Sequence, residues 1–174
     1  DCVAAQIALA QGSGSTAMVA SMPLQVFGLQ REATNWRKDA YERLCLAAAQ
    51  GALINAVASE PEMGSPSRGG LPATTAVPTG DGSGWIINGR KTWVTGGEHL
   101  THLLVYANVG NSMGILVVEK DTPGLTWEHT WKDALSLRAS DSHDVCLENV
   151  VVPLENLIDT AQAPKPNIWF PLIM

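Results

Sequence analysis

Two side chains suited to holding a flat aromatic ring lie two positions apart in the sequence. Trp93 and Thr95 belong to the β-prone run Lys91–Thr95, and residues two apart on a strand point to the same face. An indole wall beside a hydroxyl donor is a suitable half-site for a flat ligand ring, a mostly apolar plate with a polar rim. The alternative interpretation is a tryptophan of the β core beside an ordinary strand threonine.

A second polar segment is the extended turn between Ser59 and Ser65, which is built on Pro61 and Gly64. Its hydroxyls and backbone groups could contact a ligand, and a plain Ser/Gly/Pro loop is the alternative. Glu60 lies inside this turn, and a carboxylate at such a place invites interpretation as a general base.

The histidines and cysteines indicate no metal or nucleophile chemistry. No metal-ligand spacing connects the four histidines, which are His99, His102, His129 and His143. We therefore predict no metal site. The three cysteines are odd in number, far apart and outside any CxxC motif: Cys2, Cys45 and Cys146. Such a set fits a reducing cytoplasm better than a disulfide framework.

The elements that must position these groups begin with a helical first third, residues 1–56. The run Asp1–Gln11 is rich in Ala, Ile and Leu. After a Gly/Ser break, Ser15 is predicted to cap a helix that extends to about Gln30. Pro23 lies inside that pattern and predicts a kink or a boundary.

A third helix is predicted to start near Asp39. Glu42 follows three residues later, a spacing that resembles a capping box. Leu44 and Ala48 fall on one face of this helix. Gly51 is expected to end it or to bend it.

From residue 57 the pattern changes to short alternating apolar runs separated by turn residues. Trp85–Ile87 and Lys91–Thr95 flank Asn88–Gly89, and Asn-Gly between two β-prone runs predicts a hairpin. Further strands are predicted at His102–Ala107, Ile115–Glu119, Leu125–Trp131 and Asp144–Val152. The sequence therefore predicts an α+β fold, with N-terminal helices followed by an antiparallel β-barrel or sandwich over 57–160.

Composition excludes several classes of protein. The net charge of −6 and the absence of any Lys/Arg cluster argue against a nucleic-acid partner. The longest apolar runs fall short of the roughly 20 residues needed to cross a bilayer, so we predict no membrane partner. Residues 161–174 carry Pro164 and Pro166 and end on an apolar run. We expect them to form a linker that leads into a further domain, in a chain that is a piece of a longer protein.

Five motifs in one order and spacing resemble the middle domain of acyl-CoA dehydrogenases. They are SEPEMGS at 59–65, INGRKTWVTGG at 87–97, VEKDTPG at 118–124, LRAS at 137–140 and LENVVVPLENL at 147–157. The resemblance covers roughly residues 57–158. The helical first third is compatible with the end of that family's N-terminal helical domain.

The resemblance implies FAD as the cofactor. It assigns contacts with the flavin to Ala58, Ser59, Ser65, Trp93, Val94 and Thr95. Trp93 would pack beside the ring, and Thr95 would hydrogen-bond its rim near N5. Ser65 would also meet the pantetheine of an acyl-CoA substrate.

The reaction implied is α,β-dehydrogenation of an acyl-CoA thioester, with hydride transfer to flavin N5. The resemblance places the catalytic base in a C-terminal helical domain that this chain lacks, so no catalytic residue is named, and it makes Glu60 a structural residue of its turn. It further implies an electron-transfer flavoprotein or a similar acceptor, and a homodimer or homotetramer.

Two alternatives stay open. A reduced-flavin-dependent monooxygenase could use the same scaffold, although the intact Glu60–Pro61 and Gly64–Ser65 pairs favour the dehydrogenase. A non-catalytic binding or assembly module that has lost its flavin is the other alternative. Retention of both Trp93 and Thr95 argues against that module.

Overall fold

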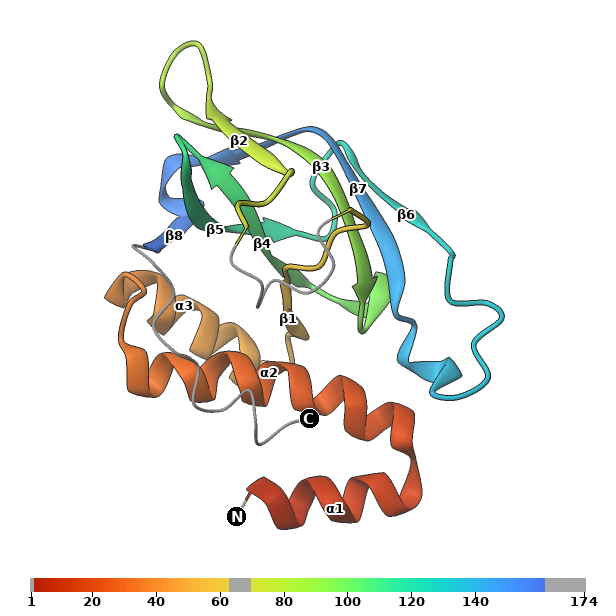
Figure 1. Cartoon of the computed structure of the whole chain (residues 1–174). Helices are drawn as coiled ribbons and strands as arrows, with labels where there is room; N and C mark the ends of the chain where they lie inside the picture. Colours follow the sequence, from red (N-terminus) through yellow and green to blue (C-terminus); the bar gives the residue numbers. More distant parts are fainter. Residues whose placement is uncertain (1, 63–69, 162–174) are drawn as a thin grey trace.

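The computed structural model describes residues 2–62 and 70–161, apart from the side chain of Ala161. Three helices come first: α1 (Cys2–Gly12), α2 (Gly14–Ala33) and α3 (Lys38–Ala49). They lie together on one side of the β region (Figure 1). The predicted linker falls almost entirely outside the described residues, and the predicted domain boundaries stay predictions.

The boundary between the first two helices differs from the prediction. Ser13, not Ser15, caps α2: its backbone is extended, and its Oγ accepts a hydrogen bond of 3.2 Å from the backbone N–H of Thr16. The helix also continues through Pro23 without a break. One lost backbone hydrogen bond does not end this helix, whose C-terminal half is anchored by the buried Val26.

The predicted capping box of the third helix does not form. The helix begins at Lys38, and its N-cap residue Arg37 makes no side-chain capping bond. Arg37 instead holds the carboxylate of Asp39, with Nη2 and Oδ2 2.6 Å apart. The predicted face does pack inward, because Leu44 is buried and Ala48 packs against the same cluster.

Eight strands of the described residues form one sheet. They are β1 (Ile54–Val57), β2 (Thr75–Pro78), β3 (Gly84–Val94), β4 (His102–Val109), β5 (Ser112–Glu119), β6 (Leu125–Glu128), β7 (His143–Pro153) and β8 (Leu157–Ala161). The strand order is β6-β7-β3-β2-β4-β5-β8, with β1 paired to β4. Most pairs are antiparallel as predicted, but β1 and β2 each run parallel to β4. The sheet is therefore mixed.

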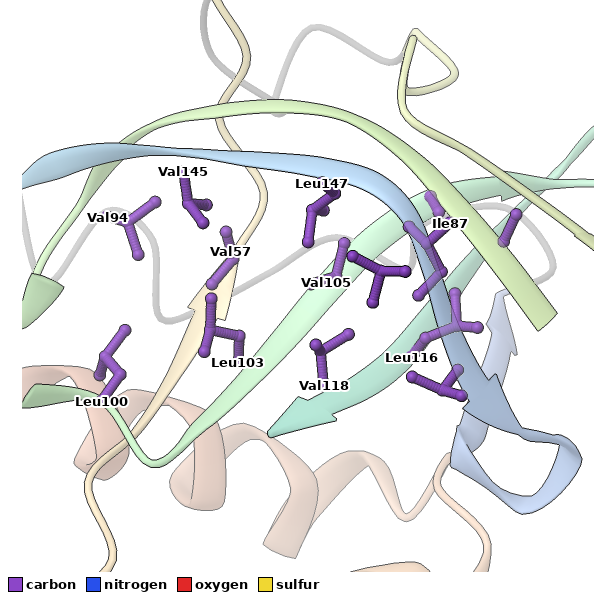
Figure 2. Packing of buried hydrophobic residues seen from close by; sticks show 14 residues of the cluster. Val57, Ile87, Val94, Leu100, Leu103, Val105, Leu116, Val118, Val145 and Leu147 are labelled. Carbon is purple, nitrogen blue, oxygen red and sulfur yellow. The ribbon is translucent and has the colours of Figure 1, made fainter. Parts of the chain in front are cut away.

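The sheet folds over so that its two halves face each other across an apolar core. Figure 2 shows Val94, Val145 and Leu147 of β3 and β7 pointing toward Leu103 and Leu116 of β4 and β5. A second cluster joins α2 and α3 to the outer side of β1, β4, β5 and β8. The described part of the chain is thus a sandwich-like β domain with a helical layer on one side.

The predicted hairpin at Asn88–Gly89 is wrong. Strand β3 continues through these residues and pairs with β2 on one side and β7 on the other, with a register shift between Ile87 and Gly89. The side chain of Asn88 accepts a hydrogen bond of 2.8 Å from the backbone N–H of Asn149 on β7. The Asn-Gly pair therefore forms a bulge inside a strand and not a turn.

Gly89 is expected to tolerate no side chain. A Cβ there would lie 2.4 Å from Thr74 Oγ1 and 2.7 Å from Thr74 Cα, at a φ of 156°. We expect Gly89→Ala to lower the free energy of unfolding by about 2–3 kcal/mol, measured by urea denaturation. Gly82→Ala is the matched control, because Gly82 also has a positive φ (70°) but open space around it. Equal losses in the two variants would contradict the role given to this close contact.

Within the two described ranges, no helix combines the length and the apolar character needed to cross a membrane.

Candidate functional site

The end of β3 carries an irregularity that decides how its side chains point. Lys91 pairs with Val145 and Val94 pairs with His143, so β3 has one more residue than β7 over this stretch. The extra residue makes a β-bulge, in which Trp93 adopts a left-handed φ of 55°.

This bulge breaks the regular alternation that the sequence predicted for Trp93 and Thr95. Trp93 is 63% exposed, whereas Thr95 is 5% exposed. The rule that residues two apart share a face applies to regular strands, and the extra residue re-aims the indole. Trp93 thus presents its ring to the surface, and Thr95 lies in the interior.

A cleft of about 690 Å³ opens beside Trp93. Its walls come from the end of β3, from the turn after β1, from the loop between β6 and β7 and from the start of β7. They are Pro61, Thr92, Trp93, Thr130, Trp131, Asp133, Ala134, Leu135, Ser136 and Asp144. Two indoles in one open cleft provide apolar area for a flat ring.

One residue of the cleft wall carries a polar atom without a partner. Thr92 Oγ1 is buried and makes no hydrogen bond to any described residue. A buried hydroxyl that lacks a partner is costly. Its place in the cleft wall is therefore compatible with a ligand that completes the hydrogen bond.

Thr95 is held from three directions. Its Oγ1 lies 3.1 Å from Ser142 Oγ, and its carbonyl accepts a bond of 2.8 Å from Asn55 Nδ2. The next backbone N–H, of Gly96, donates to the carbonyl of Ser140 at 2.8 Å. The lining of the cleft does not include Thr95. Its hydroxyl is therefore a fixed interior group whose neighbours are other hydroxyls.

A fully buried ion pair lies behind the site. Lys91 Nζ donates to Glu60 Oε1 at 2.7 Å and to the carbonyl of Tyr106 at 2.5 Å, and both charged side chains are almost fully buried. Glu60 in turn accepts bonds from the backbone N–H groups of Ala73 (2.7 Å) and Thr74 (3.0 Å). The ion pair therefore connects β3 and β4 to the residues that flank positions 61–72, which are Glu60 on one side and Ala73 and Thr74 on the other.

The contacts of Glu60 agree with a structural role and oppose a role as a base. Burial alone would raise the pKa of this carboxyl, but hydrogen bonds from Lys91 and Thr74 outweigh burial and hold the pKa below its ordinary value. Both oxygens are occupied by donors. A carboxylate stabilised in this way is a poor proton acceptor.

The other predicted residues are placed as follows. Ala58 and Ser59 are half-buried directly after β1, and the carbonyl of Ser59 accepts a bond of 3.0 Å from the backbone N–H of Thr92. The side chain of Val94 lies in the core (Figure 2), and Val94 is not part of the cleft lining. Ser65 lies outside the described residues.

Several residues around the site were missed by sequence reasoning. They are Asn55, Lys91, Thr92, Trp131, Ser140 and Ser142. A lysine inside a β-prone run, where alternate side chains face the core, is a signal that could have identified the buried ion pair. No local signal links Ser142 to Thr95, since the two are separated by β4, β5 and β6 in the sequence.

Histidine side chains brace the loop that forms one wall of the cleft. His129 and His143 pack edge to face with ring centroids 4.8 Å apart, and His129 Nε2 lies 3.0 Å from Glu98 Oε1. His143 Nδ1 accepts a hydrogen bond of 3.1 Å from the backbone N–H of Trp131. These contacts give both rings structural partners and fix the position of Trp131.

Comparison with known proteins gives a consistent family match. Residues 55–150 match the family described as "Acyl-CoA dehydrogenase, middle domain". YdbM of Bacillus subtilis (strain 168), which carries an acyl-CoA dehydrogenase name, is 39% identical over 166 residues. That alignment covers 92% of this chain and 43% of YdbM. The chain thus spans less than half of this relative.

Solved structures agree with the fold. A glutaryl-CoA dehydrogenase of Mycobacterium smegmatis in complex with FADH2 gives a TM-score of 0.72 at 27% identity, covering 87% of this chain and 38% of that protein. KijD3 in complex with dTDP also gives a TM-score of 0.72 at 27% identity, covering 91% of this chain and 41% of that protein. The same fold therefore occurs with different bound molecules.

Proposed function

Because this chain belongs to the acyl-CoA dehydrogenase family, we propose that it is part of an FAD-dependent enzyme that dehydrogenates an acyl-CoA thioester between Cα and Cβ. The observation that carries the proposal is the cleft beside the exposed indole of Trp93. The relative with FADH2 supports the choice of cofactor. Because the chain spans less than half of YdbM, the activity belongs to the whole protein.

The residues of the chain fit a flavin. Trp93 and Trp131 offer apolar walls, and Thr92 in the same cleft wall carries a buried hydroxyl without a partner. Bound FAD supplies the acceptor for the hydride that leaves the β-carbon. The backbone at Ala58, Ser59 and Val94 would contribute further contacts to it.

In this chemistry, the residues of this chain would bind and orient the flavin and the substrate. Thr95 would supply a hydroxyl to hydrogen-bond the flavin rim, and its rigid surroundings would keep that hydroxyl in place. Ser65 is proposed to meet both the flavin and the pantetheine of the substrate. A fixed donor costs no reorganisation when charge develops, which is the physical basis of its use in catalysis.

The proton at Cα requires a carboxylate base, and Glu60 is occupied by Lys91 and two backbone N–H groups. We propose that the base comes from a C-terminal helical domain. There, hydrogen bonds to the thioester carbonyl would stabilise the enolate that develops as the proton leaves.

We further propose a cytoplasmic homodimer or homotetramer that passes electrons to an electron-transfer flavoprotein or a similar acceptor. The free cysteines Cys2, Cys45 and Cys146 are compatible with a reducing compartment.

The proposed reaction predicts bleaching of the flavin by substrate. Full-length protein loaded with FAD and mixed anaerobically with a series of acyl-CoA thioesters is expected to lose the absorbance of oxidised flavin near stoichiometrically with at least one of them. The measurement is the visible spectrum, with the free acids as control substrates. Absence of bleaching with every thioester would contradict dehydrogenation.

A second candidate is a monooxygenase that uses supplied reduced flavin. The structure of KijD3 matches this chain as well as the glutaryl-CoA dehydrogenase does. Because KijD3 holds dTDP, this fold also accommodates a ligand that is not a CoA compound. The same experiment separates the two: oxygen-dependent product with reduced flavin, and no anaerobic bleaching, would favour this candidate.

A further inference from the structure

A chain of buried hydroxyls extends from Thr95 into the protein. Thr95 Oγ1 lies 3.1 Å from Ser142 Oγ, and Ser142 Oγ lies 2.9 Å from Ser140 Oγ. In both links either oxygen can be the donor. The three residues are 5%, 4% and 1% exposed, so bulk water does not compete for these bonds.

Both ends of the hydroxyl chain are fixed by the backbone. The carbonyl of Thr95 is held by Asn55, and the carbonyl of Ser140 is held by the N–H of Gly96. The hydroxyls can therefore change their hydrogen positions by rotation, while the oxygens stay in place. The remaining freedom is the direction in which the hydrogens point.

Counting hydrogens restricts that direction. Each hydroxyl has one hydrogen to donate, and the two links use two of the three hydrogens. The third hydrogen leaves the hydroxyl chain at Thr95, at Ser140 or, where both of these donate to Ser142, at Ser142. Among the described residues, none of the three hydroxyls makes a further side-chain hydrogen bond. A buried donor without an acceptor is costly, so an arrangement in which a bound ligand accepts the third hydrogen is favoured.

We propose that Ser140 and Ser142 are positioning residues that aim the hydroxyl hydrogen of Thr95 outward, toward an acceptor atom of the bound flavin. Ser140 donates to Ser142, Ser142 donates to Thr95, and Thr95 donates to the ligand. In this arrangement every hydrogen of the hydroxyl chain has an acceptor. The proposal rests on the proposed function, because it takes the ligand of Thr95 to be FAD, and it assigns a role to two serines that do not touch the ligand.

A double-mutant cycle on full-length protein tests the proposal. The affinity of the apoprotein for oxidised FAD is measured by quenching of flavin fluorescence. Ser142→Ala is expected to weaken binding about fivefold and Thr95→Val about tenfold, as the loss of one hydrogen bond predicts. Because Ser142 acts through Thr95, the double variant is expected to bind FAD no more weakly than Thr95→Val alone.

Further variants separate positioning from a general loss of structure. Ser142→Thr keeps the hydroxyl and is expected to restore the affinity, and Ser140→Ala is expected to give a smaller loss than Ser142→Ala. Thr101→Val, which removes a hydroxyl bonded to the carbonyl of Leu53, is a control expected to leave FAD affinity unchanged.

The outcomes separate the proposed role of the two serines from the proposed function. Additive losses from Ser142→Ala and Thr95→Val, or unchanged affinity in Ser142→Ala, would overturn the role of the serines while the proposed function stands. Failure of the wild-type protein to bind FAD would overturn the proposed function and the role of the serines together.

Discussion

Replacing Lys91 by Met is expected to lower the free energy of unfolding by about 3–5 kcal/mol. The side chain of Lys91 is fully buried and donates to Glu60 and to the carbonyl of Tyr106. Its removal leaves the carboxylate of Glu60 buried without a counter-ion. The measurement is denaturant unfolding of the full-length protein, followed by the signal of the β domain.

Two comparisons make the Lys91 result specific. Arg90→Met changes the neighbouring charge on the same strand, but Arg90 is half-exposed in its pairs with Glu128 and Asp144, so a much smaller loss is expected. The double variant with Glu60→Gln and Lys91→Met removes both charges and is expected to recover part of the stability. A loss in Lys91→Met no larger than in Arg90→Met would contradict the burial of the ion pair.

Replacing Trp93 by Ala is expected to weaken FAD binding by about 30-fold, which corresponds to about 2 kcal/mol. The indole is 63% exposed, and a large aromatic surface in an open cleft gains most when a ring covers it. Equilibrium titration of the full-length apoprotein with FAD measures the change.

Trp93→Phe keeps an aromatic wall and is expected to retain most of the FAD affinity. Val151→Ala is the matched control, because Val151 is 55% exposed and lies outside the lining of the cleft. Wild-type affinity in Trp93→Ala would mean that the flavin does not use this indole.

The sequence predicted the elements better than their connections. The helical first third and most strand positions follow from local periodicity, which the packed structure preserves. The hairpin at Asn88–Gly89 was wrong because the same local signal also suits a bulge, and the difference depends on contacts with Thr74 and Asn149. The parallel pairs of β4 with β1 and β2 could not be read from strand patterns, since periodicity carries no information about direction.

The candidate site likewise contains residues that the sequence singled out and tertiary contacts that it did not predict. Family motifs located Trp93 and Thr95, but the bulge that exposes the one and buries the other depends on pairing with β7. Glu60 was taken as a structural residue, and its contacts agree with that interpretation. Its partner Lys91 was not recognised, because the ion pair joins segments that are separated by β2. Tertiary contacts of this kind have no signature in local sequence.

The most direct measurement is a crystal structure of the full-length protein with FAD. We expect the isoalloxazine ring to pack against the indole of Trp93, with N5 within hydrogen-bonding distance of Thr95 Oγ1. A flavin bound elsewhere on the protein, with Trp93 free in solvent and Thr95 bonded only to Ser142, would contradict the proposal.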